Sequence, residues 1–526
     1  MKSPSQGMVE PYQLDAGLHL FTDWRYVRPG MVRWDIANGQ PSPLFAINGD
    51  PGPVHPHLLD APQHLQIIAI PAQKIGPYLG PNEPWEKVVF WSTLIYDGGK
   101  YRLWYEAVPG WLWRDKSHAN GIINDPGWCD LLCYAESDDL ITWKRPYTGI
   151  ANDPNQPPNI VYGGRLSPDS GYHGGTVFID PSAPSNERYK IFYMGRIGVN
   201  QLRETEKRLG LQADTMAIHY GSAMFGAVSP DGFHWTPLPD PVMLANSDTA
   251  NRVYFDPILN KYVAYMRMWL YGRRAVGRAE TDDFTRWPLP EPVLWITPGN
   301  SPEVDIYTNA RTSYPNSSRQ HLMFPAFYHR VTDSTQIYMA TSQEGRIWSF
   351  IPGGPVLSTG VAGEWDGGCI FAAVDLIEPG NGLAMLPFVG YRVPHKYPRY
   401  QPLGELGFAT WQAGRLSALK ATGAASFTTP QFIFEGSRLR LNLQTMHSGE
   451  VRVEIAQAEG SPRPVPQAEG PAFPGYSFAE CDLMRGDLPM HTVTWRGVSD
   501  ISGLSGKPIS LRVQMRAASL FAFQID

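Results

Sequence analysis

The sequence predicts an all-β chain, namely a five-bladed β-propeller followed by a C-terminal β-sandwich. Three observations support this prediction: a short turn motif recurs along the chain, strand-like apolar segments come in groups of four around it, and the spacing of the strands changes after about residue 421. A small β-unit cannot bury both of its faces alone. Repeated units of this kind therefore stack around a common axis.

The repeated turn has the same form at four places in the chain. Each copy has a hydroxyl residue, then an acidic pair or an Asp-Gly or Glu-Gly turn, and a Trp six positions after its start; the copies are residues 137–143, 229–235, 281–287 and 342–348. Ser and Asp side chains commonly tie such turns through local hydrogen bonds, and Trp supplies a large apolar surface. We interpret the motif as structural, with the Trp packed between blades.

Each blade is expected to contain four strands in chain order, with hairpins formed by alternating segments around tight turns. The predicted segments are 88–96, 101–105, 131–137 and from Trp143; 175–180, 189–194, 222–229 and from Trp235; 252–256, 262–268, 275–280 and from Trp287; 306–314, 321–327, 336–341 and from Trp348; and 369–377, 383–389 and 406–411, with a weaker final turn at 412–414. Residues 1–80 are expected to wrap the propeller or to close its last blade.

Two connections are longer than a turn requires. Residues 108–128 contain three Trp, and residues 198–221 contain a predicted short helix at 203–209. Long insertions in a compact repeat fold are often pocket walls, although subunit contact is an alternative. Domains are therefore predicted at 1–80 (wrapping segment), 81–420 (catalytic propeller) and 421–526 (sandwich). The sandwich strands are expected at 432–434, 439–443, 451–455, 491–495, 511–515 and 520–523, with a Pro-rich loop at 461–474.

Composition excludes several classes of function. The 526 residues carry a net charge of −6, so there is no basic footprint for nucleic acid, and no apolar run reaches the length of a membrane span. The four cysteines have neither disulfide-framework nor zinc-knuckle spacing, and we expect free thiols. No glycine fingerprint for a nucleotide is present. We expect a cytoplasmic protein without metal or cofactor, and the oligomeric state is left open.

The turn motif, the predicted propeller and the predicted sandwich together resemble the fructosidase and arabinanase group of glycoside hydrolases. The layout is most similar to glycoside hydrolase family 32, over roughly residues 88–526. The sequence lacks the WMNDPNG, Arg-Asp-Pro and Glu-Cys motifs of the family 32 fructosidases. Asp180-Pro181 and Asp256-Pro257 look like Arg-Asp-Pro, but their position predicts turn residues. The resemblance implies a glycoside hydrolase, or a transglycosylase, that acts on a furanoside such as a fructosyl or arabinosyl unit of an oligo- or polysaccharide.

Candidate site residues lie where the innermost strand of each blade begins, because these positions line the central funnel that is the active site in the resembling hydrolases. Asp248 and Asp305 are predicted as the acid and the nucleophile or base, in either order. Asp366 or Glu303 is predicted to modulate their pKa values or to anchor a hydroxyl group. The remaining candidates are substrate-binding residues at the same strand starts: Trp85, Glu86, Tyr172, His173, Arg252 and Trp365.

Glycoside cleavage requires one carboxylic acid to protonate the leaving oxygen and one carboxylate to act as nucleophile or base. Proximity and burial can separate the pKa values of such groups. Two alternatives stay open at this point. One is a non-catalytic carbohydrate-binding propeller, which needs aromatic and amide groups more than acids. The other is a lyase or epimerase, which would use Tyr172 or His173 as a base beside a cation site.

Overall fold

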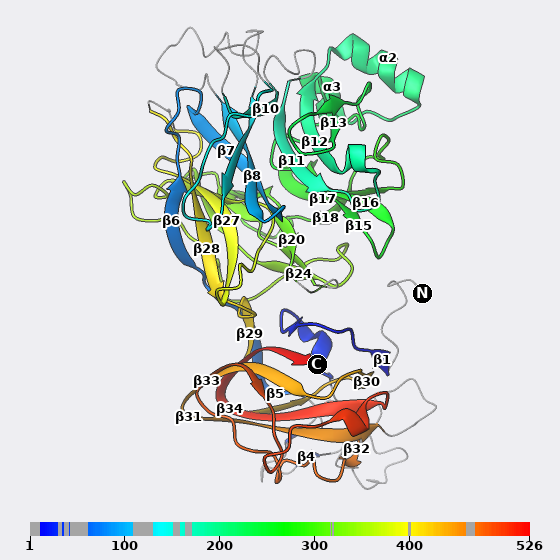
Figure 1. Cartoon of the computed structure of the whole chain (residues 1–526), viewed down its shortest axis with the longest axis vertical. Helices are drawn as coiled ribbons and strands as arrows, with labels where there is room; N and C mark the ends of the chain where they lie inside the picture. Colours follow the sequence, from blue (N-terminus) through cyan, green and yellow to red (C-terminus); the bar gives the residue numbers. More distant parts are fainter. Residues whose placement is uncertain are drawn as a thin grey trace.

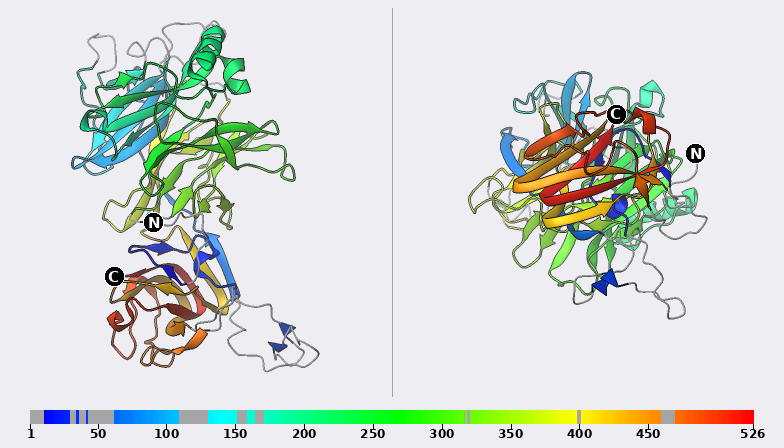
Figure 2. Two further views of the ribbon diagram at one scale, coloured as in Figure 1. Left: turned by 90° about the vertical axis from the view of Figure 1, so that its right-hand side faces the viewer. Right: turned by 90° about the horizontal axis from the view of Figure 1, so that it is seen from below.

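The computed structural model describes residues 11–29, 34–35, 41–42, 62–108, 130–150, 158–163, 171–315, 317, 320–397, 401–458 and 469–526. Strands dominate this part of the chain, and the fold is all-β with several four-stranded antiparallel sheets. The sheets form two bodies, an upper body of small sheets and a lower body around one large sheet (Figures 1 and 2). No helix in the described residues is long and apolar enough to cross a membrane.

The first small sheet fixes the geometry that matters for the site. It consists of β7 (Val88–Asp97), β8 (Lys100–Val108), β9 (Leu131–Ser137) and β10 (Ile160–Gly163), in the order β10-β9-β8-β7. Val88 pairs with Val108, and Ala107 pairs with Leu131. The start of β7, the end of β8 and the start of β9 therefore lie side by side at the same end of the sheet. The fourth strand comes later than the expected start at Trp143, where only Glu136 and Lys144 form a bridge.

The second and third sheets repeat this plan, and the second carries the helices of the insertion. Their strands are β11 (His173–Ile179), β12 (Tyr189–Arg196), β13 (Ser222–Ser229) and β14 (Thr236–Pro237), then β15 (Arg252–Asp256), β16 (Lys261–Leu270), β17 (Arg273–Thr281) and β18 (Glu291–Leu294). Between β12 and β13 lie α2 (Val199–Leu209) and α3 (Thr215–Tyr220). The predicted helix at 203–209 is thus confirmed as part of a longer helix. Residues 109–129 lie outside the described part of the chain.

The fourth group of strands is divided into two sheets. One contains β19 (Val304–Thr308), β22 (Ala326–His329) and β23 (Ser334–Ile337), and the other contains β20 (Arg311–Ser313), β21 (His321–Met323), β24 (Ala340–Ser342) and β25 (Ser349–Phe350). Pro325 separates β21 from β22, and a proline has no N–H to donate to a strand ladder. Ala310 separates β19 from β20 for another reason, because its φ of 41° lies in the left-handed region and interrupts the extended backbone. These two residues explain why the predicted strands 306–314 and 321–327 are each interrupted in the structure.

The last small sheet is completed by a strand from near the start of the chain. β26 (Cys369–Ala372), β27 (Leu383–Tyr391) and β28 (Glu405–Gln412) are followed in the sheet by β6 (Gln73–Leu79). Thr410 pairs with Gln73, and Leu406 pairs with Leu79. Strand β6 is therefore the fourth strand of this sheet, whereas three other strands from residues 1–80 belong to the large sheet of the lower body.

The large lower sheet contains nine strands from both ends of the sequence. They are β1 (Tyr12–Gln13), β2 (His19–Leu20), β5 (Gln63–Ala69), β29 (Ser417–Thr428), β30 (Phe432–Ile433), β31 (Leu439–Ala458), β32 (Glu469–Ala472), β33 (Asp487–Thr492) and β34 (Ile509–Ile525). β31 and β34 each merge two predicted strands, because they stay paired on both sides of a register shift between Thr445 and Glu450. A small ladder of β3 (Trp34–Asp35) and β4 (Pro41–Ser42) is separate.

The repeated turns have the structural role that the sequence predicts. In the copy at 229–235, Ser229 Oγ accepts hydrogen bonds from the backbone of the turn, and Asp231 Oδ1 accepts them from Phe233 and His234. The indole N–H of each Trp donates to the carbonyl three residues earlier in all four copies. Asp180 and Asp256 likewise accept backbone N–H groups of their own turns, which confirms them as turn residues.

Candidate functional site

Four side chains from three of the small sheets meet at one point, and His173 is at their centre. Nδ1 of His173 lies 2.7 Å from Asp130 Oδ2 and 2.9 Å from Glu106 Oε1. Its Nε2 lies 2.9 Å from Asp248 Oδ1. We call Glu106, Asp130, His173 and Asp248 the His173 cluster.

The strand registers explain why these residues meet. Glu106 is near the end of β8, Asp130 directly precedes β9, and these two positions share an edge of the first sheet. His173 is the first residue of β11, and Asp248 lies in the segment that leads into β15. Glu106 also binds the next sheet directly, because its Oε2 accepts a hydrogen bond of 2.6 Å from the backbone N–H of Gly174.

Gly174 and Asn251 hold the Asp248 segment against His173. Gly174 has a φ of 59°, and a Cβ at this position would overlap the carbonyl oxygen of Thr249, so only glycine fits. The side-chain amide of Asn251 donates to the carbonyls of Gly174, Ser247 and Thr249 at 2.9–3.2 Å. Asp248 is thus presented from a segment that hydrogen bonds fix on both sides.

Exposure increases from one end of the cluster to the other. The side chains of Glu106 and Asp130 are 1% and 4% exposed, that of His173 is 20% exposed, and that of Asp248 is 59% exposed. The exposed end of the cluster is therefore the Asp248 side, and the two other carboxylates lie behind the imidazole ring.

The electrostatics of the cluster follow from this packing. Burial and the charge of Glu106 raise the pKa of Asp130 to about 7, against the opposite effect of His173. Burial disfavours the charged imidazole, but Glu106, Asp130 and Asp248 raise the pKa of His173 well above its usual value. Desolvation opposes ionisation of Asp248, but the hydrogen bond and charge of His173, with the charges of Arg267 and Lys396, hold the pKa of Asp248 well below its usual value.

Cationic and aromatic groups form the side of the site opposite His173. Arg267 approaches Asp248 Oδ2 to 3.8 Å, lies over the ring of Tyr307 at 4.3 Å, and donates to the Tyr307 carbonyl. The Tyr307 hydroxyl is 2.7 Å from His395 Nε2, which follows β27. Residues from all five groups of strands in the upper body therefore surround Asp248 or support its neighbours.

The predicted residues of the first two strand starts are divided between core and site. Glu86 is fully buried and accepts hydrogen bonds from Tyr105 and Arg145 at 2.5–2.9 Å, so it acts as a structural anion. Trp85 packs against the hydrophobic core. Tyr172 is buried beside Tyr193, and burial raises its pKa well above the usual value. Of this group, only His173 belongs to the cluster.

Asp305 does not come into contact with the cluster. Its carboxylate is fully buried and is bound by Arg274 at 2.7 Å and by Arg330 at 2.8–3.1 Å. Two guanidinium groups therefore bind the Asp305 carboxylate, which was predicted to act together with Asp248. Glu303 is partly exposed, and its backbone carbonyl accepts the N–H of Arg330.

The other predicted residues also lie apart from His173. Asp366 is buried and pairs with Lys74 of β6 at 2.5 Å. Trp365 stacks near Phe388 and covers Gly390 and Gly407 of the last small sheet. Arg252 is buried and binds Asp375 at 2.5–3.2 Å. Each of these three side chains thus has partners of its own, away from the His173 cluster.

Glu106 and Asp130 were not predicted, because the prediction considered carboxylates only at the starts of innermost strands. The end of a second strand and the start of a third strand lie at the same edge in an antiparallel sheet. Glu106 directly follows the predicted strand 101–105, and Asp130 directly precedes the predicted strand 131–137. These positions are the signal in the sequence that could have identified both residues.

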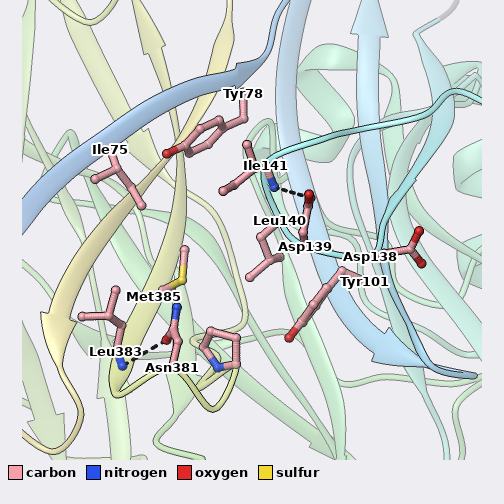
Figure 3. A pocket seen from close by; sticks show the side chains of 11 residues that line it. Ile75, Tyr78, Tyr101, Asp138, Asp139, Leu140, Ile141, Asn381, Leu383 and Met385 are labelled. Atoms are coloured by element: carbon pink, nitrogen blue, oxygen red, sulfur yellow. Dashed lines mark hydrogen bonds between the residues drawn. The ribbon is translucent and has the colours of Figure 1, made fainter.

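A separate cavity of about 240 Å³ lies at the opposite end of the same strands (Figure 3). It is lined by Tyr78, Tyr101, Asp138, Asn381 and neighbouring apolar side chains between the first and the last small sheet. Asp139 at its wall accepts the N–H groups of Ile141 and Thr142, and therefore serves the repeated turn. The cavity contains no residue of the His173 cluster.

No protein-family model matches the sequence, and no curated protein matches it. Solved structures do match. A glycoside hydrolase covers 65% of this chain and 92% of its own, with 13% identity and a TM-score of 0.42. A glycosyl hydrolase from Bacteroides ovatus covers 66% and 95%, with 12% identity and a TM-score of 0.43. An N-acetylgalactosamine deacetylase from F. plautii, in complex with blood group B trisaccharide, covers 67% and 89%, with 12% identity and a TM-score of 0.38. With TM-scores below 0.5, these matches do not assign the chain to a family.

Proposed function

We propose that the protein is a carbohydrate-active hydrolase that cleaves a glycosidic bond at the His173 cluster. One observation carries this proposal: a solvent-exposed carboxylate, Asp248, lies 2.9 Å from an imidazole nitrogen whose ring is held by two buried carboxylates. Hydrolysis of a glycoside requires an anion and a proton donor on the two sides of the scissile bond, and Asp248 and His173 supply these two groups once a substrate displaces their mutual contact.

The roles follow from exposure and contact. Asp248 is the ionised carboxylate that takes a proton from water or attacks the anomeric carbon, and Nε2 of His173 carries the proton for the leaving oxygen. The glycosidic C–O bond breaks, the oxygen of water joins the anomeric carbon and keeps one of its protons, the other proton of that water passes to Asp248, and Nε2 of His173 gives its proton to the leaving oxygen. Transfer of the proton from Asp248 to His173 then restores both groups. Asp248 thus pairs with His173 in this proposal, and the partner predicted from sequence, Asp305, serves as a structural anion.

The finer assignment rests on the resemblance and on the strand plan. We infer that the substrate is a furanoside, fructosyl or arabinosyl, and that the site is the central funnel of a five-bladed propeller. Residues 81–420 would then form the catalytic domain, residues 421–526 would brace it as a folded β-sandwich, and residues 1–80 would supply strands to both. The support for five units is that four sheets of four strands each and one group of seven short strands in two sheets follow one another along the chain, with β6 completing the last sheet.

The test is a product screen of the wild-type chain on fructans, arabinans and aryl furanosides beside two variants. Asp248→Asn is expected to lower the rate of sugar release by about 10²–10⁴-fold. Asp282→Asn is the matched control, because Asp282 has a 76% exposed side chain on the turn after β17, outside the cluster. Full activity of Asp248→Asn would contradict the proposal. Sugar binding without product release would favour the alternative of a non-catalytic binding protein.

A further inference from the structure

We propose that Glu106, Asp130 and Nδ1 of His173 together bind one divalent transition-metal ion. One ligand atom from each of these residues lies within 4.8 Å of the other two. Nδ1 is only 2.7 Å and 2.9 Å from the two carboxylates. Metal–ligand bonds of about 2.0–2.2 Å place neighbouring ligand atoms roughly 3 Å apart, so only a small adjustment would admit an ion. The sequence pointed to no metal, because Glu106 and Asp130 were not recognised.

A second observation indicates that these carboxylates are incompletely satisfied by protein groups. Asp130 Oδ1 is buried and accepts no hydrogen bond within the described part of the chain, and Glu106 Oε1 accepts none there apart from its contact of 2.9 Å with Nδ1 of His173. Both residues are more than nine-tenths buried, and both side chains face the His173 ring. A buried carboxylate oxygen without a partner is costly, and such atoms are usually explained by an ion or a functional role.

Charge balance favours a divalent ion over the imidazole proton alone. A charged His173 supplies one positive charge to two buried carboxylates, and one planar N–H cannot point at both of them. Arg267 lies 3.8 Å from Asp248 on the exposed side of the ring, so it does not offset this pair. A divalent cation with a neutral imidazole would balance the two buried carboxylates and would accept a bond from each ligand at once.

The fourth member of the cluster also fits this assignment. Metal-binding histidines usually donate their other ring N–H to a carboxylate, which fixes the tautomer and the orientation of the ring. Nε2 of His173 lies 2.9 Å from Asp248, as this arrangement requires. One imidazole with two carboxylates suits Zn²⁺ or Mn²⁺ better than Ca²⁺, which prefers oxygen ligands only.

This inference goes beyond the proposed function, because the ion would take the place of the proton on Nδ1 and leave the Nε2–Asp248 pair intact. When bound, the ion would supply Lewis acidity that polarises the imidazole. Metal binding can be measured without any substrate. Failure of the metal site and failure of the glycosidase proposal are therefore distinguishable.

The experiment is equilibrium dialysis of the metal-stripped full chain against Zn²⁺ and against Mn²⁺, with elemental analysis of the protein. We expect the wild type to bind about one equivalent and the ion to raise the melting temperature. Glu106→Gln and Asp130→Asn should weaken binding at least about 10-fold, whereas Asp282→Asn should bind as the wild type does. Ca²⁺ at the same concentration should bind at least about 10-fold more weakly.

Two results would overturn the proposal. One is the absence of stoichiometric uptake by the wild type. The other is uptake that the Glu106→Gln and Asp130→Asn variants retain unchanged. Circular dichroism in the absence of metal verifies that the variants fold. If they do not, electron spin-echo modulation of Mn²⁺ bound to the wild type decides the question, because coupling to an imidazole nitrogen supports the site and its absence refutes it.

Discussion

Nε2 of His173 lies 2.9 Å from Oδ1 of Asp248, and this contact joins the buried part of the His173 cluster to its exposed part. The other ring nitrogen is held by Glu106 and Asp130. A change at His173 is therefore transmitted to two buried carboxylates as well as to the exposed one. Because of this coupling, replacements in the cluster should change the free energy of unfolding as well as the activity.

Replacing His173 should destabilise the fold because it removes the imidazole that contacts the buried carboxyl groups of Glu106 and Asp130. His173→Ala is expected to lower the free energy of unfolding by about 3–5 kcal/mol at neutral pH in the presence of a chelator. Adding Asp130→Asn should restore part of this loss, since it removes one of the two charges. Denaturant unfolding of the two single variants and the double variant forms the test cycle. Strictly additive losses would contradict the coupling.

Asp305 offers a contrasting test, because its surroundings indicate a structural role. Asp305→Asn leaves Arg274 and Arg330 without their shared anion, and should cost about 3–5 kcal/mol of unfolding free energy. The specific activity of the folded fraction should be unchanged. Denaturant unfolding together with active-protein quantification measures both quantities. A variant with full stability and lost turnover would return Asp305 to the catalytic assignment.

The sequence was a good guide to strands and turns, because both depend on local chemistry. The hydroxyl, acidic and Trp side chains of the repeated turns bond within a few residues, as the copy at 229–235 demonstrates. Long-range effects were less predictable. Pro325 and Ala310 divide strands that looked continuous, and β31 stays in one piece because β34 remains paired along it.

The site was less predictable because the function of a carboxylate depends on its neighbours in space. Asp248, Asp305 and Asp366 have similar places in the sequence pattern, yet they meet an imidazole, two guanidinium groups and a lysine, respectively. These partners come from segments 25–292 residues away. The predicted order of the strands could indicate at which end of the sheets these carboxylates lie, but it could not indicate which side chain each carboxylate contacts.

Acid stability should depend on Asp97, which ties the first small sheet to the second. The hydrogen bond from Arg188 is the main cause that lowers the pKa of Asp97 to about 2. Burial opposes this shift. The hydrogen bond from Tyr189 and the positive charges of Arg188 and Arg102 lower the pKa further. Since the folded pKa is lower than the unfolded one, the stabilisation is present above about pH 4 and is lost as the pH falls towards 2.

Asp97→Asn should therefore cost about 1–2 kcal/mol at pH 7, after an allowance for solvent screening, and almost nothing near pH 2. Urea unfolding of wild type and variant between pH 7 and pH 2 measures the difference. Asp282→Asn serves as the control, because its exposed carboxylate should give curves that follow the wild type. A constant difference between wild type and Asp97→Asn at every pH would show that packing, not charge, explains the effect.

Two glycines with similar φ values, one of them in a repeated turn, allow the destabilisation due to backbone strain to be distinguished from that due to packing. Gly345 has a φ of 75°, and a Cβ there would overlap Tyr265 Oη, which donates a 2.6 Å hydrogen bond to the Gly345 carbonyl from the neighbouring sheet. Gly272, in the hairpin between β16 and β17, has a similar φ of 70°, but a Cβ there would meet no atom within 4 Å. Gly272→Ala should therefore cost only the left-handed backbone strain, about 1–2 kcal/mol.

Gly345→Ala should cost a further amount of about 1–3 kcal/mol, as overpacking typically does, because the added methyl displaces Tyr265 and weakens the contact between two sheets. Thermal and denaturant unfolding of the two variants give this difference directly. The additional replacement of Tyr265 by Phe should reduce it in part, since the overlapping hydroxyl is then absent while Arg278 Nη1, 2.6 Å from the added Cβ, still overlaps. Equal losses for Gly345→Ala and Gly272→Ala would mean that the repeated turn needs glycine for its backbone conformation alone, and that contact between the sheets does not depend on it.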